Sequence, residues 1–423
     1  MAIVCTDVNL FPFIQPTHPF HAHLERFQVL LNADPSYAEK MHMLNDGGSR
    51  HVHALMRARL IPDRGWELKG VHTSFQVRDA SRRRPFRALT LYYAPGANEI
   101  DSWVFPWDPY LPGLASFFGP HGGGTDAASD VDVVLAYVPR LRLTFRTQVA
   151  GGAPAIGKVV PPAEAADMYG RLVKVSAAVN DSSRTFSVAA PLGIDMTKGV
   201  FFQELRPGTE LTHLLDQDNC RDLLRAVGRI HRDLHGLNVP DLPAWNFRKF
   251  LQRLVTYVEW ISFLRPEQRP FLEDVRDLLF RQVPDLTSAD YTFCHGDFSC
   301  RQILDDHGCW SVVDFDGCLW GDPHFELAKL IASLKYTVPL FHDLFRDPTE
   351  RAPSLFQEAY EAYLQGYEEQ AQRTMNCSRI LWYRIAWEIH HLARRFKRDQ
   401  FHPVAFERAV ALIGDLSAQL RRD

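Results

Sequence analysis

The chain has 423 residues and a formal net charge of -4 at pH 7, with its Lys and Arg residues scattered along it. Hydrophobic residues make up 46% and charged residues 23%, as in an ordinary globular protein of two or three structural units. No basic stripe and no apolar run long enough to cross a bilayer is present in the sequence, so we expect neither a nucleic-acid nor a membrane partner.

The seven cysteines are an odd number, which argues against a disulfide framework. Four of them cluster without the spacing of a zinc site, and we interpret them as packing or loop thiols: Cys294, Cys300, Cys309 and Cys318. The first residues carry neither a positively charged region nor a small-residue cleavage site, so we expect a cytoplasmic location.

Residues 1–125 are expected to form an N-terminal α/β cap subdomain. A helical stretch is predicted from about Phe27 to Leu60, and the segments WELKGVHTSFQVRD and RALTLYYAPG then have the pattern of two strands of a hairpin. The segment GPHGGGTDAASD is rich in turn-forming residues and predicts a domain boundary near residue 125.

Residues 126–205 have the pattern of a small β-rich lobe. The segment VDVVLAYVPRLRLTFRTQV predicts two strands joined at Pro139 and Arg140, and IGKVV predicts a third strand. PPAEAADMYGRLVKV, which has Pro at its start, is typical of a helix, and VFFQEL begins as another strand. The remaining part, residues 206–423, is predicted to be mostly helical.

One stretch in the helical part, CHGDFSCRQILDDHGCWSVVDFDG, interrupts apolar residues with Asp297, Gln302 and Asp314. Burying a carboxylate without a compensating charge is costly. The segment DDHG predicts a β-hairpin that brings Gln302 roughly opposite Asp314, with Asp297 in the loop before it. Oxygen ligands of this kind suit Mg2+ with phosphate in the remaining positions, although the hairpin alone is equally compatible with solvated surface acids.

The motif His-Gly-Asp, followed by an amide side chain five residues after the Asp and by a strand ending in Asp-Phe-Asp, resembles the aminoglycoside phosphotransferase and choline kinase-like superfamily. The segment GDPHFELA resembles the one that follows in that family. The resemblance implies an α+β, bilobal protein-kinase-like fold with a small β-rich N-lobe and a large helical C-lobe. Bacterial maltokinases are similar in the central motif and also carry an extra N-terminal cap.

The resemblance also implies roles for single residues. Asp297 matches the catalytic Asp that orients the acceptor hydroxyl and takes its proton, and His295 matches the histidine that supports it. Asp314 matches the magnesium-binding Asp. Gln302 stands where most members have Asn, and maltokinase-like members are similar in having Gln. Asp316 is as compatible with a hydrogen-bonded loop acid as with a metal ligand.

The phosphate and adenine contacts are implied in the small lobe. Lys158, in the third strand, matches the family lysine that contacts phosphate. Glu164, in the first turn of the following helix, is its expected ion-pair partner, with Asp167 as the alternative. The turn at Pro139-Arg140 stands in the place of a glycine-rich loop. The backbone of a hinge would bind adenine, and this hinge is formed by Gln203, Glu204 and Leu205.

We therefore expect a kinase that uses ATP and Mg2+ and phosphorylates a hydroxyl of a sugar, an aminoglycoside or a related metabolite. The alternative is a catalytically inactive, nucleotide-binding pseudokinase with a regulatory role. The joint presence of Asp297, Asp314 and Lys158 favours the enzyme.

Overall fold

The computed structural model describes residues 11, 13–33, 49–61, 65–78, 86–118, 128–149, 151–180, 184–287, 290–346, 351–369, 375–398 and 400–422. The chain divides into two compact units. Unit 1 comprises Met1–Ala166, Leu192–Leu205 and Arg394–Phe401, and unit 2 comprises Asp167–Pro191, Arg206–Ala393 and His402–Asp423. The predicted boundary at residue 125 lies outside the described residues, and the chain on both sides of it belongs to unit 1.

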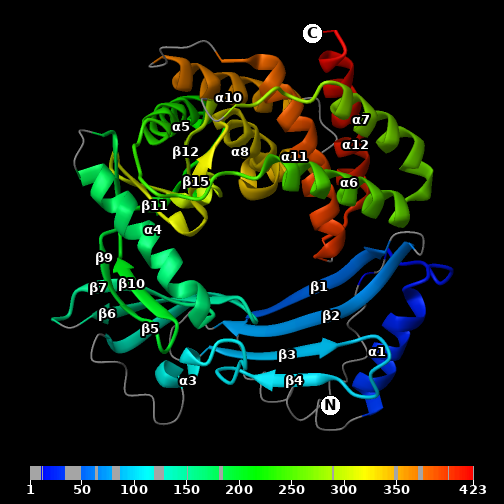
Figure 1. Ribbon diagram of the computed structural model, residues 1–423, viewed down its shortest axis with the longest axis horizontal. Coiled ribbons are helices and arrows are strands. Elements are labelled where there is room, and N and C mark those ends of the chain that lie inside the picture. Colours follow the sequence, from blue (N-terminus) through cyan, green and yellow to red (C-terminus); the bar gives the residue numbers. More distant parts are fainter. Residues whose placement is uncertain are drawn as a thin grey trace. The chain divides into compact units, whose positions relative to one another are not determined.

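Unit 1 contains an antiparallel sheet with the strand order β1-β2-β3-β4 (Figure 1). Helix α1 (His21–Ala33) precedes it, and β2 and β3 form the predicted hairpin. The strands are β1 (Ser49–Ile61), β2 (Gly65–Arg78), β3 (Arg87–Tyr93) and β4 (Asp101–Val104).

The prediction of a helix up to Leu60 is wrong for its last part, which is strand β1, while residues 34–48 lie outside the described residues. Within β1, Ala54 and Met56 are buried whereas Arg57 and Arg59 are exposed. The Ala, Leu, Met and Arg residues of this segment are good helix formers, but antiparallel pairing with β2 along the whole strand overrides that local preference.

A second sheet of unit 1 has the strand order β5-β6-β7-β10-β9. The two predicted strands around Pro139 and Arg140 are confirmed, as is the third strand with Lys158, and helix α4 (Pro162–Asn180) begins at a Pro as expected. The strands are β5 (Ala128–Val138), β6 (Arg142–Val149), β7 (Pro154–Val159), β9 (Pro191–Asp195) and β10 (Val200–Glu204).

The segment before residue 119 shares a hydrophobic core with this second sheet. Side chains of the short helix α3 (Gly113–Phe118) and of the chain before it pack with buried side chains of β5, β6, β7 and β10. Phe117, for example, contacts both Phe145 and Phe202. The N-terminal segment and the predicted small lobe therefore stabilise each other, because each buries apolar surface of the other.

Unit 2 is mostly helical, as predicted. It contains α4 from residue 167 onward and α11 (Cys377–Lys397) up to residue 393. Its other helices are α5 (Cys220–His235), α6 (Phe247–Leu264), α7 (Arg269–Arg281), α8 (Pro323–Thr337), α9 (Pro339–Arg346), α10 (Arg351–Glu368) and α12 (Pro403–Leu420). Two small sheets, β11-β13-β14-β8 and β12-β15, complete it. Their strands are β8 (Phe186–Val188), β11 (Thr209–Glu210), β12 (Thr292–Cys294), β13 (Ile303–Asp306), β14 (Cys309–Val312) and β15 (Leu319–Gly321).

Helices α5 and α10 cross at very short distance. A Cβ atom on Gly228 would lie 2.1 Å from the carbonyl oxygen of Tyr363, and one on Gly366 would lie 2.0 Å from that of Arg225. Only glycine fits at these two positions, because a side chain at either would push the helices apart. The close crossing places the buried face of α5 against the tyrosines of α10.

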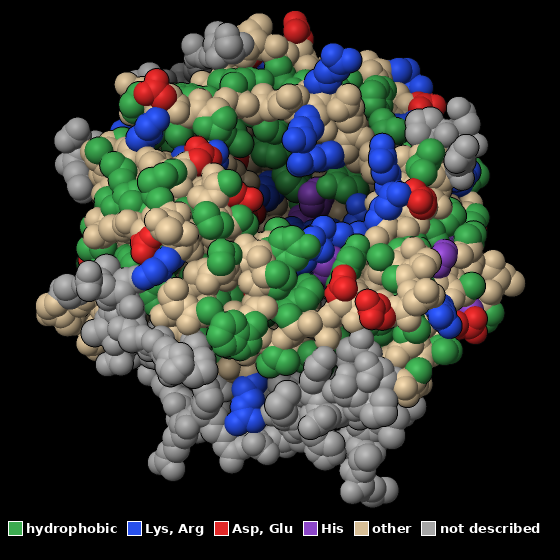
Figure 2. Space-filling view, turned by 60° about the horizontal axis from the view of Figure 1, so that its bottom comes forward, with side chains coloured by type: hydrophobic (Ala, Val, Ile, Leu, Met, Phe, Trp, Pro, Cys, Tyr) green, Lys and Arg blue, Asp and Glu red, His purple; other side chains and the backbone are tan. Residues whose placement is uncertain are grey.

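The described surface carries mixed charge. On the face in Figure 2, Lys and Arg side chains lie among Asp, Glu and hydrophobic side chains, in agreement with the scattered charge of the sequence. None of the described helices is long and apolar enough to cross a membrane.

Candidate active site

The predicted hairpin is present, and β13 and β14 are its strands. Asp306 pairs with Cys309 at its closed end, so His307 and Gly308 form a two-residue turn. Their φ angles of 53° and 90° are those of a tight hairpin turn in which both central residues are left-handed. Glycine and histidine accept this conformation more readily than a β-branched residue does.

The open end of the hairpin brings Gln302 and Asp314 near each other. Ile303 pairs with Val312, and the backbone N–H of Val313 donates to the carbonyl oxygen of Gln302 at 2.9 Å. Gln302 therefore lies opposite Val313, one residue from the predicted position opposite Asp314. Asp314 has the left-handed φ of 74°, a conformation that Asp adopts more easily than most residues and that occurs often at functional sites.

These side chains supply the oxygen atoms that a hard cation prefers. Asp314 offers a carboxylate and Gln302 an amide oxygen, and both side chains are half-buried. The Ser299 hydroxyl donates to the Gln302 amide oxygen. This bond orients the oxygen and leaves its second lone pair for a ligand. The residues present therefore fit Mg2+ by donor type.

Asp297 follows β12 in a loop with an unusual backbone. Gly296 has φ of 83°, and a Cβ atom there would lie 2.1 Å from the carbonyl oxygen of Gly317. Glycine is thus required just before Asp297, whose side chain is 59% exposed. The buried imidazole of His295 connects this loop to the hairpin, because its Nε2 lies 3.0 Å from the carbonyl oxygen of Val313 and its Nδ1 accepts from the backbone N–H of Asp297 at 3.3 Å.

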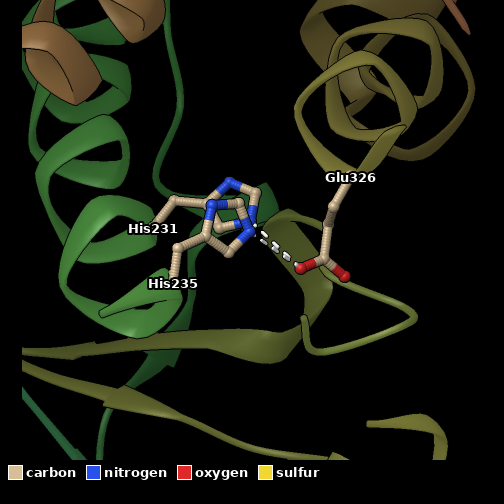
Figure 3. Close-up of side chains that lie close together, drawn as sticks. All are labelled: His231, His235 and Glu326. Carbon is tan, nitrogen blue, oxygen red and sulfur yellow. Dashed lines mark hydrogen bonds and ion pairs between the residues drawn. The ribbon is translucent and has the colours of Figure 1, made fainter. Parts of the chain in front are cut away.

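Glu326, in the first turn of α8, holds the backbone of the same loop. Its Oε1 accepts from the N–H of Gly296 at 2.6 Å, and its Oε2 accepts from the N–H of His295 at 2.9 Å. Two imidazoles of α5 reach the same Oε2, with distances of 3.2 Å from Nε2 of His231 and 3.3 Å from Nε2 of His235 (Figure 3). Glu326 and both imidazoles are buried.

The protonation states of this cluster follow from its burial. Burial is the main reason that the pKa of His231 falls to about 3, and it also lowers the pKa of His235. Burial opposes ionisation of Glu326, but the hydrogen bonds from the two histidines outweigh it and hold the pKa of Glu326 well below its usual range. The cluster is therefore an anionic carboxylate with two neutral imidazoles.

The hydrogen bonds of the two imidazoles are complete. Nδ1 of His231 lies 2.5 Å from the hydroxyl of Tyr363, and Nδ1 of His235 lies 2.8 Å from that of Tyr367. Two histidines and a glutamate are also ligand types of zinc sites. Each tyrosine hydroxyl can donate to Nδ1 while each Nε2–H donates to Glu326, so we interpret the cluster as a hydrogen-bonded support of the loop.

Lys329 lies one turn after Glu326 in α8 and touches the predicted catalytic residue. Its Nζ donates to the carbonyl oxygen of Gly296 at 2.6 Å and to Oδ1 of Asp297 at 2.6 Å. Our sequence interpretation assigned no role to Glu326, Lys329 or the two histidines. The available signal was the i, i+4 spacing of His231 and His235, which places them on one helix face.

Lys158 and the predicted hinge residues belong to unit 1. Lys158 is 5% exposed, and its Nζ lies 5.8 Å from the centre of the Phe201 ring on the neighbouring strand β10. Gln203 and Glu204 end β10, and the N–H of Leu205 donates to the carbonyl oxygen of Pro154 at 3.2 Å. The chain enters unit 2 directly after Leu205, which suits a hinge, although adenine binding there stays a prediction.

The two candidate partners of Lys158 lie in α4. Glu164 is in the first turn and exposed, and its pairing with Lys158 stays a prediction. The carboxylate of Asp167 pairs with Arg171 at 2.5 Å, and Arg171 also donates to the carbonyl oxygen of Asp316 at 2.9 Å. Asp167 thus pairs with Arg171, and its role as the alternative partner of Lys158 stays a prediction.

The turn at Arg140 is fixed by the N-terminal segment. The buried carboxylate of Asp108 accepts from the N–H of Arg140 and from the hydroxyl of Tyr137, each at 2.8 Å. The guanidinium of Arg140 lies 3.9 Å from the centre of the Tyr110 ring. This turn, in the place of a glycine-rich loop, is thus held by side-chain contacts.

The sheet order of unit 1, the helix after its third strand and the Asp297 loop followed by a hairpin define a kinase-like phosphotransferase. The model of the phosphotransferase enzyme family matches residues 141–375, more than half of the chain. The chain belongs to this family, and the resemblance seen in its sequence is confirmed. Residues 1–118 lie outside the matched part.

Solved structures are similar to this chain, and the one with a TM-score above 0.5 shows the shared fold. A putative aminoglycoside phosphotransferase from Ralstonia eutropha is 15% identical with a TM-score of 0.51, and the match covers 73% of this chain and 98% of that one. Choline kinase from Streptococcus pneumoniae is 16% identical with a TM-score of 0.44, over 67% and 94% of the two chains. A search of curated proteins finds no match. The mixed helix and strand class is confirmed, whereas the bilobal arrangement and the separate cap stay predictions.

Proposed function

We propose that the protein transfers the γ-phosphoryl group of ATP to a hydroxyl of a small molecule such as a sugar, an aminoglycoside or a related metabolite. One observation carries this proposal. Asp297 is exposed in a loop whose backbone is tied to Glu326 and His295, while Lys329 binds its Oδ1. A carboxylate held in this way is suited to orient a hydroxyl, because its direction is set before the substrate arrives.

Each further residue has one proposed task. Asp297 accepts the proton of the acceptor hydroxyl, and His295 supports the loop through its two backbone contacts. Asp314 and Gln302 would hold Mg2+, which when bound neutralises charge on the phosphate oxygens. Lys158 contacts phosphate with Glu164 as its partner. The backbone of Gln203, Glu204 and Leu205 binds adenine.

The test is phosphoryl transfer from labelled ATP to a panel of hydroxylated metabolites, with two variants. Asp297→Asn should reduce transfer by about a hundredfold or more while ATP binding survives, because Asn keeps the size but cannot take the proton. Asp314→Ala should stay folded and lose magnesium-dependent turnover. Asp306→Asn, at the closed end of the same hairpin, is the matched control and should stay active.

Two results would contradict the proposal. A wild-type protein that binds ATP but neither transfers phosphate to an acceptor nor hydrolyses ATP would support a pseudokinase instead. Full activity of Asp297→Asn or of Asp314→Ala would remove the assigned role from that residue.

A further inference from the structure

The side chain of Lys329 is mostly buried, and only its end contacts the exposed side chain of Asp297. The side chain of Lys329 is 12% exposed although its partner Asp297 is 59% exposed. Its Nζ lies 5.4 Å from the centre of the ring of Trp387, which is itself buried. The methylene groups of Lys329 are therefore mostly buried, and its ammonium group reaches the exposed carboxylate of Asp297.

Exposed ion pairs contribute little to stability. A lysine whose side chain is buried against Trp387 is therefore more than an ordinary surface ion pair needs. Unit 2 contains such a pair for comparison. Nζ of Lys174 donates to the carbonyl oxygen of Asp241 at 3.1 Å and lies 3.8 Å from its carboxylate, with side chains 36% and 86% exposed. Lys329 makes the same two kinds of contact at 2.6 Å, with the side chain mostly buried.

The hydrogen-bond count of Lys329 leaves one donor for a substrate. An ammonium group has three N–H donors. Within the described part of the chain, two of them bind the carbonyl oxygen of Gly296 and Oδ1 of Asp297. No described residue donates to Oδ2 of Asp297, so this oxygen is left for the acceptor hydroxyl.

Among the described residues, Asp297 makes its ion pair with Lys329 of α8 and not with a cation of its own loop. Two positions after it stands Ser299, whose hydroxyl faces Gln302, and Arg301 is exposed further along. A phosphoryl group transferred at Asp297 develops charge on its oxygens, and a fixed donor there lowers the barrier. Lys329 is the cation that α8 brings to this point.

We propose that Lys329 is a further catalytic residue of the phosphoryl transfer, an inference that rests on the function proposed above. One N–H holds Oδ1 of Asp297 so that Oδ2 faces the acceptor, and the third N–H binds an oxygen of the transferring phosphoryl group. The acceptor oxygen forms a bond to the γ-phosphorus while the bond from that phosphorus to the leaving oxygen of ADP breaks. The hydroxyl proton goes to Oδ2, and Lys329 stays protonated throughout.

The experiment compares Lys329→Met, Lys329→Arg and Lys329→Ala with wild type, and Lys174→Met serves as the matched control. Transfer to the acceptor found in the panel is measured, or slow hydrolysis of ATP if no acceptor is found. Lys329→Met keeps the length of the stem and should lower kcat by about a hundredfold with the KM for ATP changed less than about threefold. Lys329→Arg should keep part of the activity, and added ethylammonium should partly restore Lys329→Ala. Lys174→Met should match wild type.

The possible failures are distinct. A wild type without transfer or hydrolysis overturns the proposed function and, with it, the role of Lys329. An active wild type with a near-normal Lys329→Met shows that the contact is an ordinary ion pair. If kcat falls but neither Arg nor the added amine restores any of it, and the melting temperature falls as well, Lys329 acts only as a structural support and the inference is wrong.

Discussion

Replacing Glu326 by Gln tests whether the buried carboxylate holds the catalytic loop. The carboxylate accepts four hydrogen bonds, one at Oε1 from Gly296 N–H and three at Oε2 from His295 N–H, His231 and His235. Gln has nearly the same shape but turns one of the two acceptors into a donor. The histidines can change tautomer and accept from this new donor, whereas the two backbone N–H groups can only donate.

The expected loss of stability follows from the four hydrogen bonds that Glu326 accepts. In either orientation the amide NH2 faces a backbone donor, of Gly296 or of His295. Loss of one charge-assisted hydrogen bond costs about 1.5–3 kcal/mol, and a buried donor left without a partner costs about 1–3 kcal/mol more. We therefore expect Glu326→Gln to lower the free energy of unfolding by about 2.5–6 kcal/mol. Transfer should fall too, because the N–H groups that orient Asp297 lose their anchor.

Urea unfolding followed by tryptophan fluorescence measures this change, since Trp260 and Trp382 are buried in unit 2. Glu361→Gln is the control, because that carboxylate is exposed on α10 and accepts a hydrogen bond from Gln357 at 2.8 Å. It should change stability by less than about 0.5 kcal/mol. A loss below about 1 kcal/mol for Glu326→Gln would refute the reasoning, because the buried donors would then have found other partners.

Two further predictions concern pH and the metal site. The pKa of His72 also falls to about 3, by burial first and then through Arg57 and Arg140. Between about pH 3 and pH 6.5, each of His72 and His231 therefore binds a proton in the unfolded chain but not in the folded one. Stability should therefore decrease as the pH falls, by about 2 kcal/mol per histidine between pH 7 and pH 5, and urea unfolding curves that do not shift over this range would contradict it. Gln302→Asn shortens the side chain that carries the amide oxygen by one methylene and should weaken magnesium-supported transfer. The two proteins are compared with Mg2+ and with Mn2+, and a gain of activity in the variant would count against a working kinase.

Local features of the fold could be predicted from neighbouring residues alone. The hairpin of β13 and β14 follows from apolar segments on both sides of a turn-forming DDHG, and the first three strands of the small lobe follow in the same way. The position of Asp297 just before that hairpin was equally predictable. The contacts that form these elements lie within a short stretch of chain, so the sequence pattern carries the information.

The sequence by itself determined the family, the Asp297 loop and the hairpin, because each depends on residues close together in the chain. Tertiary structure decided that β1 is a strand, since only pairing with β2 outweighs its helix-forming residues. Tertiary structure also decided which residues hold the Asp297 loop in place. His231 and His235 lie 95 and 91 positions before Glu326, and they meet it only because α5 and α8 pack on the same loop. The position of α5 depends in turn on its close crossing with α10 at Gly228, and a contact between such distant residues is set by the packing of whole helices.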